Sequence, residues 1–178
     1  MTLILSLDDD PVILQLIGLP LALAGYEHQR FTNSHEALAA LRTEMVDLFT
    51  QDCLRPDIRG LDLYRLLKSD QDLRHIPVLF ISAVHQPEFA AECRTVFGDD
   101  YLNKPFTPQE LLTAVTAMLR RHNRHVPTEE ERAARYEHIR DDLKNELGAW
   151  MDLSTERLDA LYEKLSSFLT QIDRVPES

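Results

Sequence analysis

Five side chains that could act together in one reaction each stand at the end of a short apolar segment: Asp8, Asp9, Asp52, Ser82 and Lys104. Three carboxylates held close together repel one another and would take up protons unless a cation lay among them. An all-oxygen set of ligands suits Mg²⁺, which commonly completes its shell with water and phosphate oxygens. A hydroxyl and an ammonium nearby could position the oxygens of a phosphoryl group during its transfer. One carboxylate could then be the nucleophile and form an aspartyl phosphate.

Asp52 is the best-defined of these positions. A mostly apolar run, residues 46–51, leads into it, and the turn residues Pro56, Asp57 and Gly60 follow. Because open α/β sheets bind ligands at the carboxyl ends of their strands, we expect Asp52 to face a ligand site. Gln51, the last residue of the run, is polar, and the pattern offers no physical reason for it.

Apolar runs alternate with helical patterns up to about residue 122, which predicts a doubly wound parallel α/β sheet. Strands are expected at residues 3–7, 26–31, 46–51, 76–81 and 101–102. Helices are expected at residues 11–25, 34–41, 61–68, 89–96 and 108–119. The near-continuous apolar strands suit a sheet that helices cover on both faces. With strand order 2-1-3-4-5, the five chemical side chains converge on one edge.

The composition changes after residue 122. Residues 128–131 have the form of a capping box, and apolar residues then recur at helical spacing as far as Trp150. A second amphipathic helix is predicted from Ser154. We therefore expect one domain over residues 1–122 and an antiparallel helical hairpin within 123–178. A hairpin buries few side chains by itself, so it needs its own N-terminal domain, a second copy or a partner protein as a further surface. We prefer homodimerisation to docking on a different protein.

Charge and composition narrow the class of protein. The 178 residues carry a net charge of −11, which disfavours non-specific binding to nucleic acids or anionic membranes. From His122 onward, eight Lys and Arg stand against thirteen Asp and Glu, which weakens a DNA-binding interpretation of the hairpin. Cys53 and Cys93 have no metal-ligand spacing and are expected to be buried thiols. No signal peptide or membrane-spanning run is evident, so we expect a cytoplasmic protein.

Four stretches of residues 1–122 resemble the receiver (CheY-like) domain of bacterial two-component response regulators: Leu7 to Pro11, Asp52 with Pro56 and Gly60, Ser82-Ala83, and Tyr101 to Phe106. Each motif alone is weak, but four in the same order at matching spacing are specific. The resemblance implies the flavodoxin-like sheet and a receiver that catalyses only its own phosphorylation and dephosphorylation. It also implies that Asp52 accepts a phosphoryl group from a histidine kinase or a phosphotransfer protein.

The same resemblance implies roles for the other site residues. Asp9 would bind Mg²⁺ directly and Asp8 through water, with Asp52 and the backbone carbonyl of Leu54 as further ligands. Ser82 and Lys104 would each contact a phosphoryl oxygen, and the Lys104–Pro105 peptide would be cis. Ser82 and Tyr101 would form the switch pair, the ring turning inward when the hydroxyl moves toward the phosphoryl group. That movement would repack the face made by the fourth helix, the fifth strand and the fifth helix.

The residues suggest three candidate functions. The leading interpretation is a phosphorelay protein whose phosphorylation changes protein–protein contacts. The alternative is a phosphorylation-controlled transcriptional regulator with an atypical DNA-binding segment. A phosphatase of related fold is set aside, because it would place a second Asp where Leu54 stands. Leu54 and Val84 are both apolar and cannot orient an attacking water, so we predict slow self-dephosphorylation.

Overall fold

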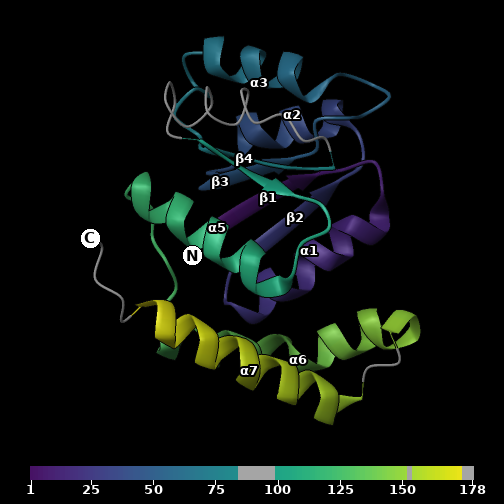
Figure 1. Ribbon diagram of the computed structural model, residues 1–178, viewed down its shortest axis with the longest axis vertical. Coiled ribbons are helices and arrows are strands. Elements are labelled where there is room, and N and C mark those ends of the chain that lie inside the picture. The colour runs from purple at the N-terminus through teal and green to yellow at the C-terminus, as the bar shows by residue number, and fades with distance from the viewer. Residues whose placement is uncertain (84–98, 152–153, 174–178) are drawn as a thin grey trace.

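A computed structural model describes residues 1–83, 99–151 and 154–173 (Figure 1). The strands are β1 (Leu3–Leu7), β2 (Glu27–Phe31), β3 (Leu48–Gln51), β4 (Val78–Ser82) and β5 (Asp100–Asn103). The helices are α1 (Pro11–Leu23), α2 (Ser34–Thr43), α3 (Gly60–Ser69), α5 (Pro108–Arg121), α6 (Glu129–Met151) and α7 (Thr155–Asp173). The helix expected at residues 89–96 lies outside the described residues, as do Val84 and Cys93.

The sheet confirms the predicted fold. Its five strands lie in the order β2-β1-β3-β4-β5, and every neighbouring pair is parallel. Because all strands run the same way, their carboxyl ends share one edge, where the last residues of β1, β3, β4 and β5 lie. Asp8, Asp52 and Lys104 directly follow their strands there, Asp9 comes one residue after Asp8, and Ser82 is itself the last residue of β4.

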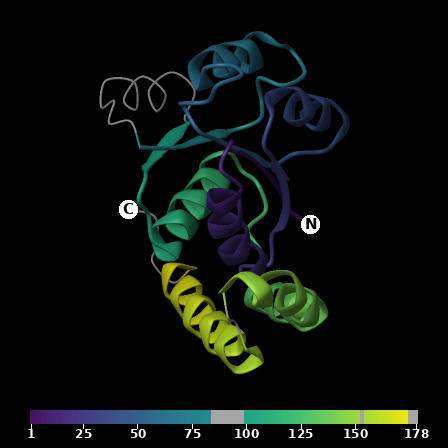
Figure 2. The same cartoon turned by 90° about the vertical axis from the view of Figure 1, so that its right-hand side faces the viewer.

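Alternating side chains of the strands form two apolar clusters, one on each face of the sheet. In β1, Leu3, Leu5 and Leu7 pack with α2 and α3, whereas Ile4 packs with α1 and α5. Figures 1 and 2 show α2 and α3 on one side of the sheet and α1 and α5 on the other. Both faces are therefore covered, as the apolar strands predict.

At the start of two helices near the site, the side chain of the N-cap residue caps the helix. Asp10 accepts a hydrogen bond from the Val12 N–H at 2.8 Å and precedes Pro11, the first residue of α1. Asn33 accepts one from the Glu36 N–H at 2.9 Å and begins α2. These caps fix where the chain leaves the loops after β1 and β2, which are neighbours at the site edge.

The helices α6 and α7 lie together against α1 and α5, on the side away from the sheet (Figures 1 and 2). Their apolar residues join the cluster on that face, and its buried members from the two helices are Tyr136, Leu143, Leu158, Tyr162, Leu165 and Leu169. The rings of Tyr136 and Tyr162 stack with centroids 3.9 Å apart, and this contact holds α6 to α7. The hairpin thus packs on the N-terminal part of its own chain.

Charged groups secure the end of α7. The Asp173 carboxylate pairs with Arg120 of α5 at 2.6 Å and with Arg132 of α6 at 3.3 Å. Arg132 is almost fully buried, and its guanidinium also donates to the Pro127 carbonyl at 2.8 Å. Since this docking uses the apolar face of the hairpin, a four-helix bundle of two copies would need the hairpin to leave α1 and α5. Homodimerisation stays a prediction.

Among the described residues, no helix combines the length and the apolar character that a membrane crossing requires.

Candidate functional site

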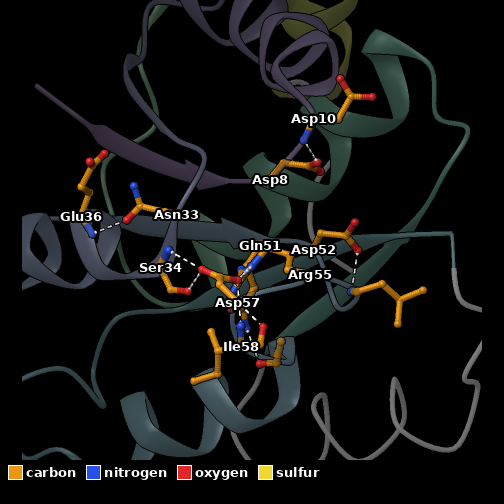
Figure 3. Close-up of polar contacts among 12 residues, drawn as sticks. Asp8, Asp10, Asn33, Ser34, Glu36, Gln51, Asp52, Arg55, Asp57 and Ile58 are labelled. Atoms are coloured by element: carbon orange, nitrogen blue, oxygen red, sulfur yellow. Dashed lines mark hydrogen bonds and ion pairs between the residues drawn. The ribbon is translucent and has the colours of Figure 1, made fainter.

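The carboxyl edge of the sheet brings three carboxylates together. Asp8 follows β1 and Asp52 follows β3, and both side chains are buried (Figure 3). Asp9 is exposed, and one carboxylate oxygen from each of Asp8, Asp9 and Asp52 lies within 4.8 Å of the others. The backbone N–H of Asp10 donates to Asp8 at 3.0 Å, and that of Leu54 donates to Asp52 at 3.2 Å. The strand ends thus assemble the predicted acidic cluster.

Lys104 reaches this cluster from the loop after β5. Its Nζ lies 2.6 Å from Asp8 Oδ2 and 3.0 Å from Asp52 Oδ2. Its backbone N–H donates to the Ser82 carbonyl at 3.0 Å and holds the loop to the end of β4. The Lys104–Pro105 peptide is cis, as expected. The ammonium therefore contacts both buried carboxylates at once.

The surroundings shift the pKa values of the two buried carboxyls, Asp8 and Asp52, in opposite directions. Burial raises the pKa of Asp8 above its ordinary value, although its bonds to Lys104 and Asp10 act the other way. Burial also acts to raise the pKa of Asp52, but hydrogen bonds from Ser82, Lys104 and the Leu54 N–H outweigh it, and the pKa is lowered. The pKa of Lys104 is raised, since its two carboxylate partners outweigh the effect of burial. Asp52 is thus an ionised carboxylate at neutral pH beside an ammonium.

The donor set fits a hard divalent cation. All three carboxylates offer oxygen, and one of them, Asp9, faces solvent, where a hydrated ion could enter. Leu54 lies in the same loop as Asp52 with its side chain directed to solvent, 61% exposed, so its backbone rather than its side chain belongs to the site.

Ser82 and Tyr101 lie side by side on β4 and β5. Ser82 is fully buried, and its side chain hydrogen-bonds the Asp52 carboxyl. The Tyr101 hydroxyl donates to the Ser82 carbonyl at 3.4 Å, and its ring stacks against Phe80 with centroids 6.4 Å apart. Burial raises the pKa of the Tyr101 hydroxyl. The two residues predicted to form a switch are therefore in contact with each other and, through Ser82, with Asp52.

Sequence reasoning missed a second polar group beside Asp52. Arg55 and Asp57 form an ion pair at 3.3 Å within the loop between β3 and α3, and Asp57 also binds Ser34 at the start of α2 (Figure 3). The sequence pattern predicts a plain turn residue at Asp57 and assigns no role to Arg55. The only sequence signal was the density of charge in residues 55–59, because Ser34 is distant along the chain.

Gln51 gains a physical reason from the same loop. Its side chain lies on the α2–α3 face of the sheet, and its amide donates to the Gly60 carbonyl at 3.2 Å. The Gly60 N–H donates to the Cys53 carbonyl at 2.9 Å, and a Cβ on Gly60 would stand 2.5 Å from the Asp52 carbonyl oxygen. The start of α3 is thereby held against the backbone of Asp52, and only glycine leaves room for that.

Known proteins resemble the chain in both sequence and structure. The family profile described as "Response regulator receiver domain" matches residues 4–116. The phosphate regulon transcriptional regulatory protein PhoB of Pseudomonas aeruginosa is 35% identical over 118 residues, which are 66% of this chain and 52% of PhoB. The DNA-binding dual master transcriptional regulator RpaA of Synechocystis is 31% identical over 170 residues, 96% of this chain and 66% of RpaA. The chain thus spans between about half and two thirds of the length of these relatives.

Solved receiver structures superpose on the N-terminal part of the chain. The receiver domain of Francisella response regulator 1452 gives a TM-score of 0.61 with 30% identity, covering 68% of this chain and 98% of the other. The chemotaxis protein CheY4 of Vibrio cholerae gives a TM-score of 0.60 with 26% identity, covering 66% and 98%. The match therefore falls on the sheet and its helices, and about a third of the chain lies beyond it.

Proposed function

Because this chain belongs to the response regulator receiver domain family of two-component systems, we propose that Asp52 accepts a phosphoryl group from a histidine kinase or a phosphotransfer protein. One observation carries the proposal: Asp52 is a buried, ionised carboxylate that bonds both Ser82 and Lys104 beside Asp8 and Asp9. This is the set of groups that phosphoryl transfer to a carboxylate requires.

Each group has a chemical task in the proposed reaction. An Asp52 carboxylate oxygen attacks phosphorus, forming a P–O bond while the P–N bond of the donor phosphohistidine breaks. The Lys104 ammonium, now shared between Asp8 and Asp52, is available to pair with a phosphoryl oxygen. The Ser82 hydroxyl, now bonded to Asp52, can bond a second oxygen. Mg²⁺, held by Asp8, Asp9, Asp52 and the Leu54 carbonyl, would offset negative charge on the phosphoryl oxygens. We propose no other enzymatic activity.

The test is transfer from a small phosphodonor, acetyl phosphate, followed by intact-protein mass spectrometry. We expect the full chain to gain one phosphoryl group in the presence of Mg²⁺ and not with a chelator, and Asp52→Asn to gain none. Asp10→Asn is the matched control, since asparagine caps a helix as well as aspartate does. Equal phosphorylation of Asp52→Asn and the wild type would overturn the assignment of the acceptor.

The proposed output is a change in protein–protein contacts. The contact of Tyr101 with Ser82, which itself bonds Asp52, supports coupling of the site to the β5 surface. Sedimentation of the Mg²⁺-bound protein, before and after addition of beryllofluoride, tests whether assembly is that output. A mass change that disappears in Asp52→Asn supports a switched homodimer. An unchanged monomer contradicts it and leaves a separate partner protein as the target.

A second candidate, transcriptional regulation, is favoured by the names of the relatives, one of which is a DNA-binding regulator. Against it, the segment from His122 is acidic, and its described residues form helices without a strand. Binding of duplex DNA that weakens steeply with salt would support this candidate. A cytoplasmic location is part of either proposal.

A further inference from the structure

The loop between β3 and α3 carries both the proposed acceptor and a proposed Mg²⁺ ligand. Asp52 opens the loop, and Leu54, two residues later, donates its N–H to Asp52 at 3.2 Å; the Leu54 carbonyl is the proposed ligand. The position of that carbonyl depends on the loop backbone alone, because the Leu54 side chain is exposed. The contacts that hold the backbone of residues 53–58 therefore also set the position of the Leu54 carbonyl.

Arg55, the next residue, is a cation enclosed in this loop. Its side chain has no exposed surface, and its Nε and Nη2 donate to Asp57 Oδ1 at 3.3 Å and to the Ile58 carbonyl at 3.2 Å. Its Nη1 is buried and has no hydrogen-bond partner among the described residues. Burial of an incompletely paired guanidinium lowers stability, so the fold alone gives little reason for an arginine here.

Asp57 connects this cation to a different element. Its Oδ2 accepts hydrogen bonds from the Ser34 N–H, at 2.8 Å, and from the Ser34 hydroxyl, while its Oδ1 accepts from the Ile58 N–H at 2.8 Å (Figure 3). Burial is the largest single influence and opposes ionisation, but these bonds and the Arg55 charge together outweigh it and hold the pKa of Asp57 far below its ordinary value. The loop is thus tied through an ionised carboxylate to the start of α2.

We propose that Arg55 is a positioning residue which, with Asp57 and Ser34, holds the loop so that the Leu54 carbonyl and Asp52 meet Mg²⁺ together. This inference rests on the proposed function of the site. The hydrogen bonds of Arg55 go to Asp57 and to the Ile58 carbonyl, not to Asp8, Asp9 or Asp52, so Arg55 acts through the backbone of residues 54–58. Groups that orient metal ligands in this way typically change metal affinity about 10- to 100-fold when they are removed.

The direction of the effect separates positioning from simple charge. Removal of a cation near three carboxylates strengthens Mg²⁺ binding by Coulomb's law alone. Positioning predicts the opposite: Arg55→Leu should bind Mg²⁺ about tenfold more weakly. Arg59→Leu is the matched control, because Arg59 lies in the same loop with its side chain 80% exposed and pairs with Asp62. It should bind Mg²⁺ as tightly as the wild type or slightly more tightly.

The experiment is titration calorimetry of the full chain with MgCl₂ alone, with thermal unfolding of each variant as a check on folding. Ser34→Ala, which removes one bond at the far end of the connection, should weaken Mg²⁺ binding in the same direction but less. Arg55→Lys keeps the charge without the fork of donors and should restore less than half of the lost affinity on a logarithmic scale. In phosphorylation by acetyl phosphate, the half-saturating Mg²⁺ concentration should rise, while the rate at saturating Mg²⁺ stays within about twofold.

Unchanged or tighter Mg²⁺ binding by Arg55→Leu would overturn the inference. A rate that stays low at saturating Mg²⁺ would also overturn it, since that is the pattern of general structural damage. If Arg55→Leu does not fold, Ser34→Ala decides, and unchanged affinity in that variant contradicts the proposal. Failure of the proposed function is distinct: the wild type would then gain no phosphoryl group on Asp52, whatever its affinity for Mg²⁺.

Discussion

Gly25 and Arg132 approach each other so closely that a Cβ on Gly25 would stand 3.1 Å from Arg132 Cγ and 3.2 Å from its Cα. Gly25 follows α1 with φ +83°, a conformation that residues with a side chain adopt at a loss of about 1–2 kcal/mol. Arg132 lies in the first turns of α6. The turn after α1 therefore needs glycine for two reasons: the positive φ of its backbone and the close approach of the docked hairpin.

Gly25→Ala should lower the free energy of unfolding by more than the backbone strain of about 1–2 kcal/mol, because the new methyl also meets Arg132. Urea unfolding of the full chain measures this. Gly25→Asn separates the two causes, since asparagine tolerates positive φ but still carries a Cβ. If Gly25→Asn is as stable as the wild type, contact with Arg132 does not restrict this position.

Asp9→Asn should remove the stabilisation that Mg²⁺ provides. For the wild type, Mg²⁺ at ten times its dissociation constant should add about 1.4 kcal/mol to the free energy of unfolding. Without Mg²⁺, the variant should be as stable as the wild type or more so, because one of three crowded carboxylates loses its charge. Thermal unfolding with Mg²⁺ or a chelator tests both statements. Asp141→Asn, on the exposed surface of α6, makes the same charge change and should keep the full Mg²⁺ effect.

Leu54→Asn should shorten the lifetime of the phosphorylated protein on the order of tenfold, because an amide at this exposed position can orient an attacking water. Loss of the phosphoryl group is followed by mass spectrometry after removal of the donor. Leu66→Asn, at an exposed leucine of α3, is the control and should leave the lifetime unchanged. A wild-type lifetime of only seconds would contradict the prediction that Leu54 and Val84 make dephosphorylation slow.

His28 should make the fold less stable in mild acid. Burial, with a further contribution from the charge of Arg30, lowers its pKa to about 3, and its Nε2 lies 2.8 Å from Ser6 Oγ. An unfolded chain, in which His28 returns to its ordinary pKa of 6.5, binds a proton first as pH falls. Stability from this group is therefore complete above about pH 6.5 and decreases as pH falls toward 3. Between pH 7 and pH 5 the loss should be about 1–2 kcal/mol.

The measurement is urea unfolding of the wild type and His28→Gln at both pH values. The difference between the two proteins isolates the histidine from other groups that titrate. His35→Gln, at an exposed residue of α2, is the control and should behave as the wild type does. Equal loss of stability in wild type and His28→Gln would show that His28 does not carry the effect.

The arrangement of the five strands and of Asp8, Asp52, Ser82 and Lys104 could be predicted because it follows from local pattern and one topological rule. Apolar runs mark the strands, and parallel strands bring their carboxyl ends to one edge. The site chemistry then depends only on which residue ends each run. The observed strand bounds differ from the predicted ones by a residue or two, as at β4, but the same side chains still lie at the carboxyl edge.

The contacts of Gln51, Arg55 and Asp57 could not be predicted, because their partners come from other elements. Asp57 has turn-residue chemistry whether or not Ser34 lies beside it, and an arginine in a loop is ordinarily exposed. Only the approach of α2 and α3 to the loop after β3 makes these side chains a buried polar group.

By itself the sequence determined that residues 123–178 contain two helices with apolar faces, because helical spacing is a property of each segment alone. It could not determine what covers those faces, since an apolar stripe suits its own domain, a second copy or a partner almost equally. Only the tertiary structure shows that, within one chain, they pack on the N-terminal part, and homodimerisation stays a prediction. The exposed flank of α1 and α5 offered a complementary apolar surface, and Gly25 and Asp173 provided the close contact and the charge that place the hairpin there.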